Sequence, residues 1–367
     1  MRFVKYEDLK PGMRIARPIY NKKGVLLYDR GSKLTDSAVS SVKNFGLIGV
    51  YILDAAEPIP PMTEEDIEFE RFQAINVFAL GDEVKAILNT KHTRKLDIIA
   101  ADIQKNYGHL RKKINFTQGI RSQEDFVYKH CLNVALLSAM MCNKMNAPAG
   151  DINDCLLACL IHDIGKTTVP FQLLFGEEPD EIERILDTAQ ETGFEIVAEV
   201  FSSNQNVRRI CAQTHKILQD LKYGREQEKM KIFLGTRVML VAEVFDDLTS
   251  MDISGNKEPL SPIKALSYLL EHPDVFNKKA VEALTESIEI LGPGTSVELS
   301  NGDKALVVSS STADLLHPMV LNFHTNEMID LSNRRLYDDL EIVDVVKTMD
   351  SRYVMSDEDL RKLGIKK

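Results

Sequence analysis

The sequence lacks an apolar run long enough to cross a membrane. Although 44% of its 367 residues are hydrophobic, no segment approaches the roughly 18 consecutive apolar residues that a membrane-spanning helix needs. The N-terminal stretch, MRFVKYEDLK, also has no apolar core of the kind found in secretion signals. We therefore expect a cytoplasmic protein that does not use a membrane as a partner.

An excess of positive charge is missing as well. Lys and Arg number 45 against 55 Asp and Glu, which gives a formal net charge of −10. A chain with this balance is not expected to bind DNA, RNA or an anionic surface in general. A local basic pocket for a smaller anion is still compatible with this net charge.

The cysteines show none of the C-x-x-C spacing that is typical of redox or zinc motifs. There are five of them: Cys131, Cys142, Cys155, Cys159 and Cys211. An odd number in a cytoplasmic chain indicates free thiols. Cys155 and Cys159 would stack on one face of a helix, and we expect them to be buried structural residues.

The chain divides into four parts by its hydrophobic periodicity and its proline and glycine content. We predict a small N-terminal α+β unit over 1–55, a proline-rich linker with connecting helices over 56–117, a helical domain over 118–290, and a small β unit with a tail over 291–367. The fold class is therefore mainly α, with a helical bundle flanked by two small units.

Apolar residues at three-to-four-residue spacing support the central helices. The stripes run through five segments: 125–145, 152–166, 181–201, 207–221 and 237–251. The helices expected within 63–115 would serve either as a connector or as the contact of a homodimer. Toward the C-terminus, Asn301-Gly302 between two alternating runs predicts a β-hairpin.

A histidine and an aspartate stand side by side at the end of an apolar helix, in CLIHDIGK. Where a helix gives way to a loop, the backbone can turn both His162 and Asp163 inward. Gly165 lets the chain leave tightly, and Lys166 could then reach an anionic substrate. Imidazole and carboxylate groups in this arrangement are candidate ligands of a divalent metal.

Further ligands are expected from other helices. Glu243 lies in the apolar run VMLVAEVFDD, where a carboxylate is costly to bury unless it is paired or bound to a metal. His130 lies on an apolar helical face, where a histidine taken alone is more often a satisfied core group than a ligand. Asp163 could instead cap the following turn. Asp246 and Asp247 are expected to cap or solvate a helix end rather than bind metal.

Three motifs in this order and spacing, DFVYKHCLNVA, HDIGK and VAEVFDDLTS, resemble those of HD-domain phosphohydrolases. Within that family they are similar to the HD-GYP group, which linearises cyclic di-GMP. The resemblance covers about residues 118–290, and residues 5–31 are similar to the N-terminal unit of such proteins. It implies a helical bundle, a cyclic dinucleotide substrate and a two-metal centre. The first metal would be bound by His130, His162, Asp163 and Glu243.

Several residues that this group uses are absent. By the resemblance, its middle histidine falls on Ala189, and its His-His-Glu segment falls on Thr214, His215 and Lys216. The Gly-Tyr-Pro tripeptide is missing from ILQDLKYGREQ. The second metal would keep only Asp163 and His215, and Lys216 could supply charge in its place. The resemblance therefore implies a divergent member with one divalent metal per chain or none, and Fe, Mn, Zn and Ni all fit such ligands.

Three functions follow from these residues. The first is a phosphohydrolase with one metal and weak or lost activity, in which Asp163 and Lys166 are catalytic. The second is an inactive descendant that senses a nucleotide or docks a signalling protein. The third is a structural adaptor that works through its flanking units. The retained HDIGK and Glu243 favour the first two, although His215 could also be a plain surface histidine.

Overall fold

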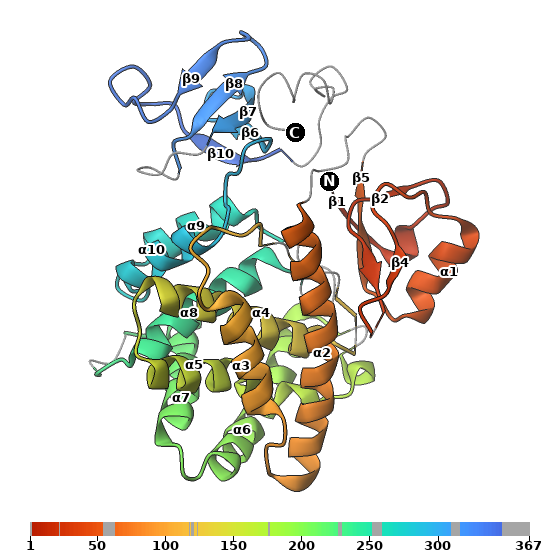
Figure 1. Ribbon diagram of the computed structural model, residues 1–367, viewed down its shortest axis with the longest axis vertical. Coiled ribbons are helices and arrows are strands. Elements are labelled where there is room, and N and C mark those ends of the chain that lie inside the picture. Colours follow the sequence, from red (N-terminus) through yellow and green to blue (C-terminus); the bar gives the residue numbers. More distant parts are fainter. Residues whose placement is uncertain are drawn as a thin grey trace.

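The computed structural model describes residues 2–346, apart from 22, 54–62, 117, 119–120, 123, 175–176, 227–229, 252–258 and 310–315. Helices dominate this part of the chain, and two small units of strands flank them (Figure 1). The predicted mainly α fold is therefore confirmed. None of the described helices combines the length and the apolar character that crossing a bilayer requires. The proline-rich linker and the tail after residue 346 lie outside the described residues.

The N-terminal unit combines a three-stranded antiparallel sheet, a separate hairpin, one α-helix and a short 3-10 helix (Tyr6–Asp8). Its elements are β1 (Arg2–Lys5), β2 (Arg14–Ile15), β3 (Ile19–Tyr20), β4 (Leu26–Tyr28), α1 (Asp36–Asn44) and β5 (Gly49–Leu53). β5 lies between β1 and β2, while β3 pairs with β4. The N-cap Thr35 starts α1. Val42 of α1 packs with Ile15 and Val50, so the unit has a core of its own.

The central body is a bundle of helices. It contains α2 (Glu64–Thr90), α3 (Leu96–Tyr107), α4 (Phe126–Lys144), α5 (Ala149–Ile161), α6 (Pro179–Val200), α7 (Gln205–Lys222), α8 (Leu234–Thr249), α9 (Pro262–Glu271) and α10 (Lys278–Ser287). α2, α5, α8 and α10 all pack against α4. Every residue from His130 to Cys142 is buried, as expected of a helix that other helices surround.

The connecting helices share the hydrophobic core of the bundle. Phe69 and Leu80 of α2 and Ile99 of α3 are buried in the same cluster as Leu132 of α4. α2 and α3 therefore pack as part of the bundle core. A homodimer contact through α2 and α3 stays a prediction.

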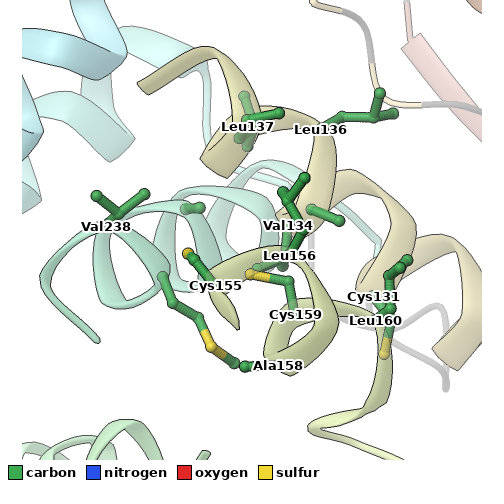
Figure 2. Packing of buried hydrophobic residues seen from close by; sticks show 14 of the residues in the cluster. Cys131, Val134, Leu136, Leu137, Cys155, Leu156, Ala158, Cys159, Leu160 and Val238 are labelled. Atoms are coloured by element: carbon green, nitrogen blue, oxygen red, sulfur yellow. The ribbon is translucent and has the colours of Figure 1, made fainter. Parts of the chain in front are cut away.

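All five cysteines are free and buried. Figure 2 shows Cys155 and Cys159 of α5 among the apolar side chains of α4 and α8. Cys155 Sγ lies 3.6 Å from the carbonyl oxygen of Gly235, and Cys159 Sγ lies 3.4 Å from Ser138 Oγ. The expected burial of these thiols is confirmed, and they join α5 to both neighbouring helices.

The C-terminal unit is a five-stranded antiparallel sheet in the order β10-β6-β7-β8-β9. Its strands are β6 (Ser296–Leu299), β7 (Lys304–Ser309), β8 (Met319–Asn322), β9 (Met328–Asp330) and β10 (Ile342–Val345). The predicted hairpin joins β6 to β7, and Gly302 there has a φ of +85°, which glycine adopts readily. The sheet attaches to α9, where Lys264 Nζ lies 2.7 Å from Asp344 Oδ2.

The turn that follows α5 touches α6 backbone to backbone. A Cβ atom added to Gly165 would collide with the carbonyl oxygen of Ala189 and would lie 2.8 Å from the nitrogen of Gly193. Gly165 itself has a φ of −62°, a conformation open to any residue. Glycine is therefore required here for the close approach of α6 and not, as the sequence indicated, for the exit of the chain.

Replacing Gly165 by Ala is expected to destabilise the fold by about 1–3 kcal/mol, because the added methyl group has no space. Gly150→Ala is the matched control, since no atom lies within 4 Å of a Cβ at that position in α5. There alanine should stabilise the helix by up to about 1 kcal/mol. Urea unfolding of both variants measures the difference. An unchanged free energy of unfolding in Gly165→Ala would contradict this packing.

Candidate metal centre

Four ionisable side chains converge from three helices of the bundle. His130 projects from α4, His162 and Asp163 directly follow α5, and Glu243 projects from α8. All four residues are buried, and their ligand atoms lie within 4.8 Å of one another. The structure therefore brings together the four residues that the sequence assigns to one metal.

The Nε2 atoms of both histidines face the two carboxylates. His130 Nε2 lies 3.1 Å from Glu243 Oε2 and 3.8 Å from Asp163 Oδ2. His162 Nε2 lies 2.9 Å and 3.6 Å from the same two oxygens. Atoms that bind one ion at about 2.1 Å are themselves about 3.0–3.4 Å apart. The two distances to Glu243 are close to that spacing, whereas the two distances to Asp163 are longer.

The other ring nitrogen of each histidine, Nδ1, forms a hydrogen bond outside the cluster. His130 Nδ1 lies 2.7 Å from Asp246 Oδ2, and His162 Nδ1 lies 2.8 Å from the carbonyl oxygen of Cys159. An ionised carboxylate and a carbonyl oxygen only accept hydrogen bonds, so each Nδ1 donates. This directs both Nε2 atoms into the cluster, as is typical of histidines that bind metals.

The expectation that Asp246 caps or solvates a helix end is wrong. Its side chain is 0% exposed and lies within α8, one turn after Glu243. Four side chains donate hydrogen bonds to it: Gln118 Nε2 at 2.7 Å, Asn133 Nδ2 at 2.8 Å, Arg121 Nη2 at 2.6 Å and His130 Nδ1 at 2.7 Å. A buried carboxylate stays ionised only with such compensation.

The residues that support the cluster were not predicted from the sequence. Asp246 follows Glu243 by three residues, so helical periodicity places both on one face and could have identified it. The same spacing relates Asn133 to His130. Arg121 lies in a segment outside helices and strands, where no periodicity marks it.

Neighbouring opposite charges offset the free-energy cost of burying the charged side chains of the cluster. Burial lowers the pKa of His130, but the Glu243 and Asp246 carboxylates raise it to about 10. Burial raises the pKa of Glu243, yet the two histidines hold it well below its usual value. The pKa of Asp246 is likewise raised by burial but brought to about 2 by Arg121 and His130. Without a metal, His130 is therefore protonated at neutral pH.

Two atoms in the cluster have no hydrogen-bond partner among the described residues. His162 Nε2 and Glu243 Oε2 are both buried and lie 2.9 Å apart, without the geometry of a hydrogen bond. Buried polar atoms without a partner are destabilising unless a ligand satisfies them. Two imidazoles and two carboxylates suit a divalent transition-metal ion. The residues present therefore fit such an ion.

A cavity of about 230 Å³ lies beside the cluster, and Lys166 lines it. Lys166 Nζ lies 2.7 Å from Asp163 Oδ2. Burial lowers the pKa of this amine, but the Asp163 and Glu243 carboxylates raise it by more. The pKa is therefore above its usual value, and the side chain is a cation at neutral pH. It is therefore placed to bind an anionic group next to the cluster.

His215 lines the same cavity but lies outside the four-residue cluster. Its ring packs edge-on against Phe194, with the centroids 4.8 Å apart, and burial lowers its pKa. It is thus neither a plain surface residue nor a ligand of the first site. Thr214 also lines the cavity, and its buried hydroxyl has no hydrogen-bond partner among the described residues.

The cation that α7 contributes to the cavity wall is Lys222 and not the predicted Lys216. Lys216 Nζ lies 3.3 Å from Asp220 Oδ2 on its own helix. Lys222 Nζ lies 2.8 Å from both Glu183 Oε1 and Asp187 Oδ2 on α6. These three residues all line the cavity, so the ion pairs tie α7 to α6 along its wall.

Metal binding is expected to strengthen as the pH rises. Because the pKa of His130 is raised to about 10 in the metal-free protein, a proton must leave before the ion binds. Between pH 8 and pH 6 the Kd for Mn²⁺ should increase about tenfold per pH unit for each proton released. Calorimetric titration in buffers of different ionisation enthalpy measures the Kd and the proton release. An affinity that does not depend on pH would contradict the raised pKa.

Comparison with known proteins agrees with this geometry. Residues 127–242 match the family model of the HD domain. A cyclic di-GMP phosphodiesterase of Pseudomonas aeruginosa is 23% identical over 239 residues, which is 64% of this chain and 56% of that protein. The chain thus matches a little over half the length of this curated relative. No solved structure matches the chain. The match over residues 127–242 supports a relationship to HD-domain phosphohydrolases.

Proposed function

We propose that this chain is a metal-dependent phosphohydrolase of the HD-GYP type that holds one divalent ion and hydrolyses a cyclic dinucleotide weakly. The observation that carries the proposal is the buried cluster of His130, His162, Asp163 and Glu243 beside a cavity that Lys166 lines. The HD domain supports the reaction class. The similarity to a cyclic di-GMP phosphodiesterase supports the substrate.

Each side chain of the site has a separate role in the proposed reaction. A divalent ion held by the cluster would polarise a phosphoryl oxygen and acidify a water molecule near the phosphorus. Lys166 binds a non-bridging oxygen of the phosphodiester and offsets the charge that develops on it. Asp163, 2.7 Å from Lys166 Nζ, orients that amine as well as serving the cluster. Asp246 keeps His130 in the orientation that the cluster needs.

A second ion would find few protein ligands. By the resemblance, its ligands fall on Ala189, Thr214 and His215, in addition to the shared Asp163. Alanine has no donor atom, and a threonine hydroxyl is a poor substitute for an imidazole. Two metal ions normally stabilise both the attacking and the leaving oxygen. With one ion the leaving oxygen lacks that support, so turnover is expected to be slow.

The cavity is too small to enclose a whole cyclic dinucleotide. Pockets that enclose a drug-sized ligand measure about 300–1,000 Å³, whereas this cavity measures about 230 Å³. A cyclic dinucleotide would place one phosphodiester and its sugar inside, with the rest of the ring outside. Binding would then depend on surfaces around the cavity mouth.

A second candidate is a regulator that senses a nucleotide or docks a signalling protein without chemistry. The ion pairs around the cavity favour it, because Lys222 is held by Glu183 and Asp187, and Lys166 is held by Asp163. Cations already neutralised in this way contribute less to transition-state stabilisation. Nucleotide binding without hydrolysis would distinguish this candidate from the first.

Saturating Mn²⁺ is expected to fill one site per chain. Glu243→Gln should weaken that site strongly, because a neutral amide oxygen is a poorer ligand than the carboxylate oxygen that lies close to both histidines. Asp247→Asn is the matched control, since Asp247 lines the cavity but lies outside the cluster. Titration calorimetry and metal analysis give the stoichiometry. Two or more ions per chain would show that the second site is intact.

The double variant Ala189→His/Thr214→His is expected to increase hydrolysis of cyclic di-GMP. Restoring two imidazoles should let a second ion bind, and a gain of about tenfold or more corresponds to about 1.4 kcal/mol of transition-state stabilisation. The same pair of substitutions with Asp163→Ala is the control and should be inactive. Rapid hydrolysis by the unaltered chain, lost in Asp163→Ala, would show instead that the missing histidines are dispensable.

A further inference from the structure

The N-terminal unit contacts the segment that precedes α4. The N–H of Ile48 donates a hydrogen bond to the carbonyl oxygen of Arg121 at 3.2 Å. Next to it, Leu47 and Ser122 form an antiparallel bridge. Ile48 leads directly into β5, the middle strand of the unit's sheet. A shift of this strand would therefore displace the backbone of Arg121.

The side chain of Arg121 extends in the other direction, to the support of the metal cluster. It is 4% exposed, and its Nη2 lies 2.6 Å from Asp246 Oδ2. The same oxygen accepts the hydrogen bond from His130 Nδ1 at 2.7 Å. One oxygen atom is thus shared between a residue that the N-terminal unit holds and a residue of the cluster.

The N-terminal unit is built as a separate body. Its core around Val42 and Val50 is distinct from the core of the bundle. Figure 1 shows the unit beside α2, where Arg17 Nη1 lies 3.2 Å from Glu70 Oε1. Bodies with separate cores and a limited contact readily move relative to each other. The contact at Arg121 continues to Asp246, whereas the contact of Arg17 is with Glu70 on α2.

We propose that Arg121 is a positioning residue that couples the placement of the N-terminal unit to the metal affinity of the cluster. When the unit holds the Arg121 backbone, the guanidinium and His130 share Asp246, and His130 Nε2 faces Glu243. When that contact is lost, His130 loses part of its orientation. Such coupling is reciprocal, so metal binding strengthens the Ile48–Arg121 contact by the same factor. The inference rests on the proposed metal binding.

Three variants of the full chain test the coupling by calorimetric titration with Mn²⁺. Arg121→Gln should weaken binding about 10–100-fold, as is typical when the support behind a metal-bound histidine is lost. Arg121→Lys should restore part of the affinity, because it keeps the charge but not the forked geometry. Arg17→Gln removes the ion pair with Glu70, leaves the Ile48–Arg121 hydrogen bond in place and should leave the affinity unchanged.

Hydrogen exchange gives a readout that does not require the variants to fold. In the wild type, exchange of the Ile48 amide should slow when Mn²⁺ is added. Unchanged exchange at Ile48 in a protein that binds Mn²⁺ would overturn the coupling and leave the metal site standing. Failure of the wild type to bind Mn²⁺ would overturn the metal site and the coupling together.

Discussion

The buried carboxylate of Asp246 is the constraint on which the metal centre depends. Removed from water, it stays ionised because one guanidinium, two amides and an imidazole all donate to it. Through His130 it orients the cluster, and through Arg121 it anchors the segment before α4. A buried charge that loses one partner is destabilising by about 3–5 kcal/mol. The same contacts therefore maintain both the fold and the candidate site.

The bundle holds this polar group within a tightly packed apolar body. α4 is buried along its length from His130 to Cys142, and the turn after α5 is pressed against α6 at Gly165. Close packing of this kind leaves little freedom for the four side chains of the cluster. The candidate metal site is therefore preorganised, whereas the positions that the resemblance gives to a second site carry residues that bind metals poorly. The proposed weak hydrolysis of a phosphodiester by one ion rests on that asymmetry.

Much of this arrangement could be predicted from the sequence, because it depends on patterns of residues that are close together in the chain. Apolar stripes indicate the helices, Asn301-Gly302 indicates the hairpin, and a carboxylate inside an apolar run singles out Glu243. The supporting contacts could not be predicted in the same way. Arg121 and Asp246 are 125 residues apart in the chain, and only the tertiary fold brings them together. Lys222 was missed for the same reason, since its partners belong to another helix.

Diffraction from crystals grown with Mn²⁺, recorded at the manganese absorption edge, tests the central claim most directly. The account predicts one anomalous peak per chain, within about 2.0–2.2 Å of His130 Nε2, His162 Nε2 and an oxygen of each of Asp163 and Glu243. Two peaks of similar height, the second beside His215, would contradict the single-metal centre. The absence of any peak at the cluster would contradict the metal centre itself.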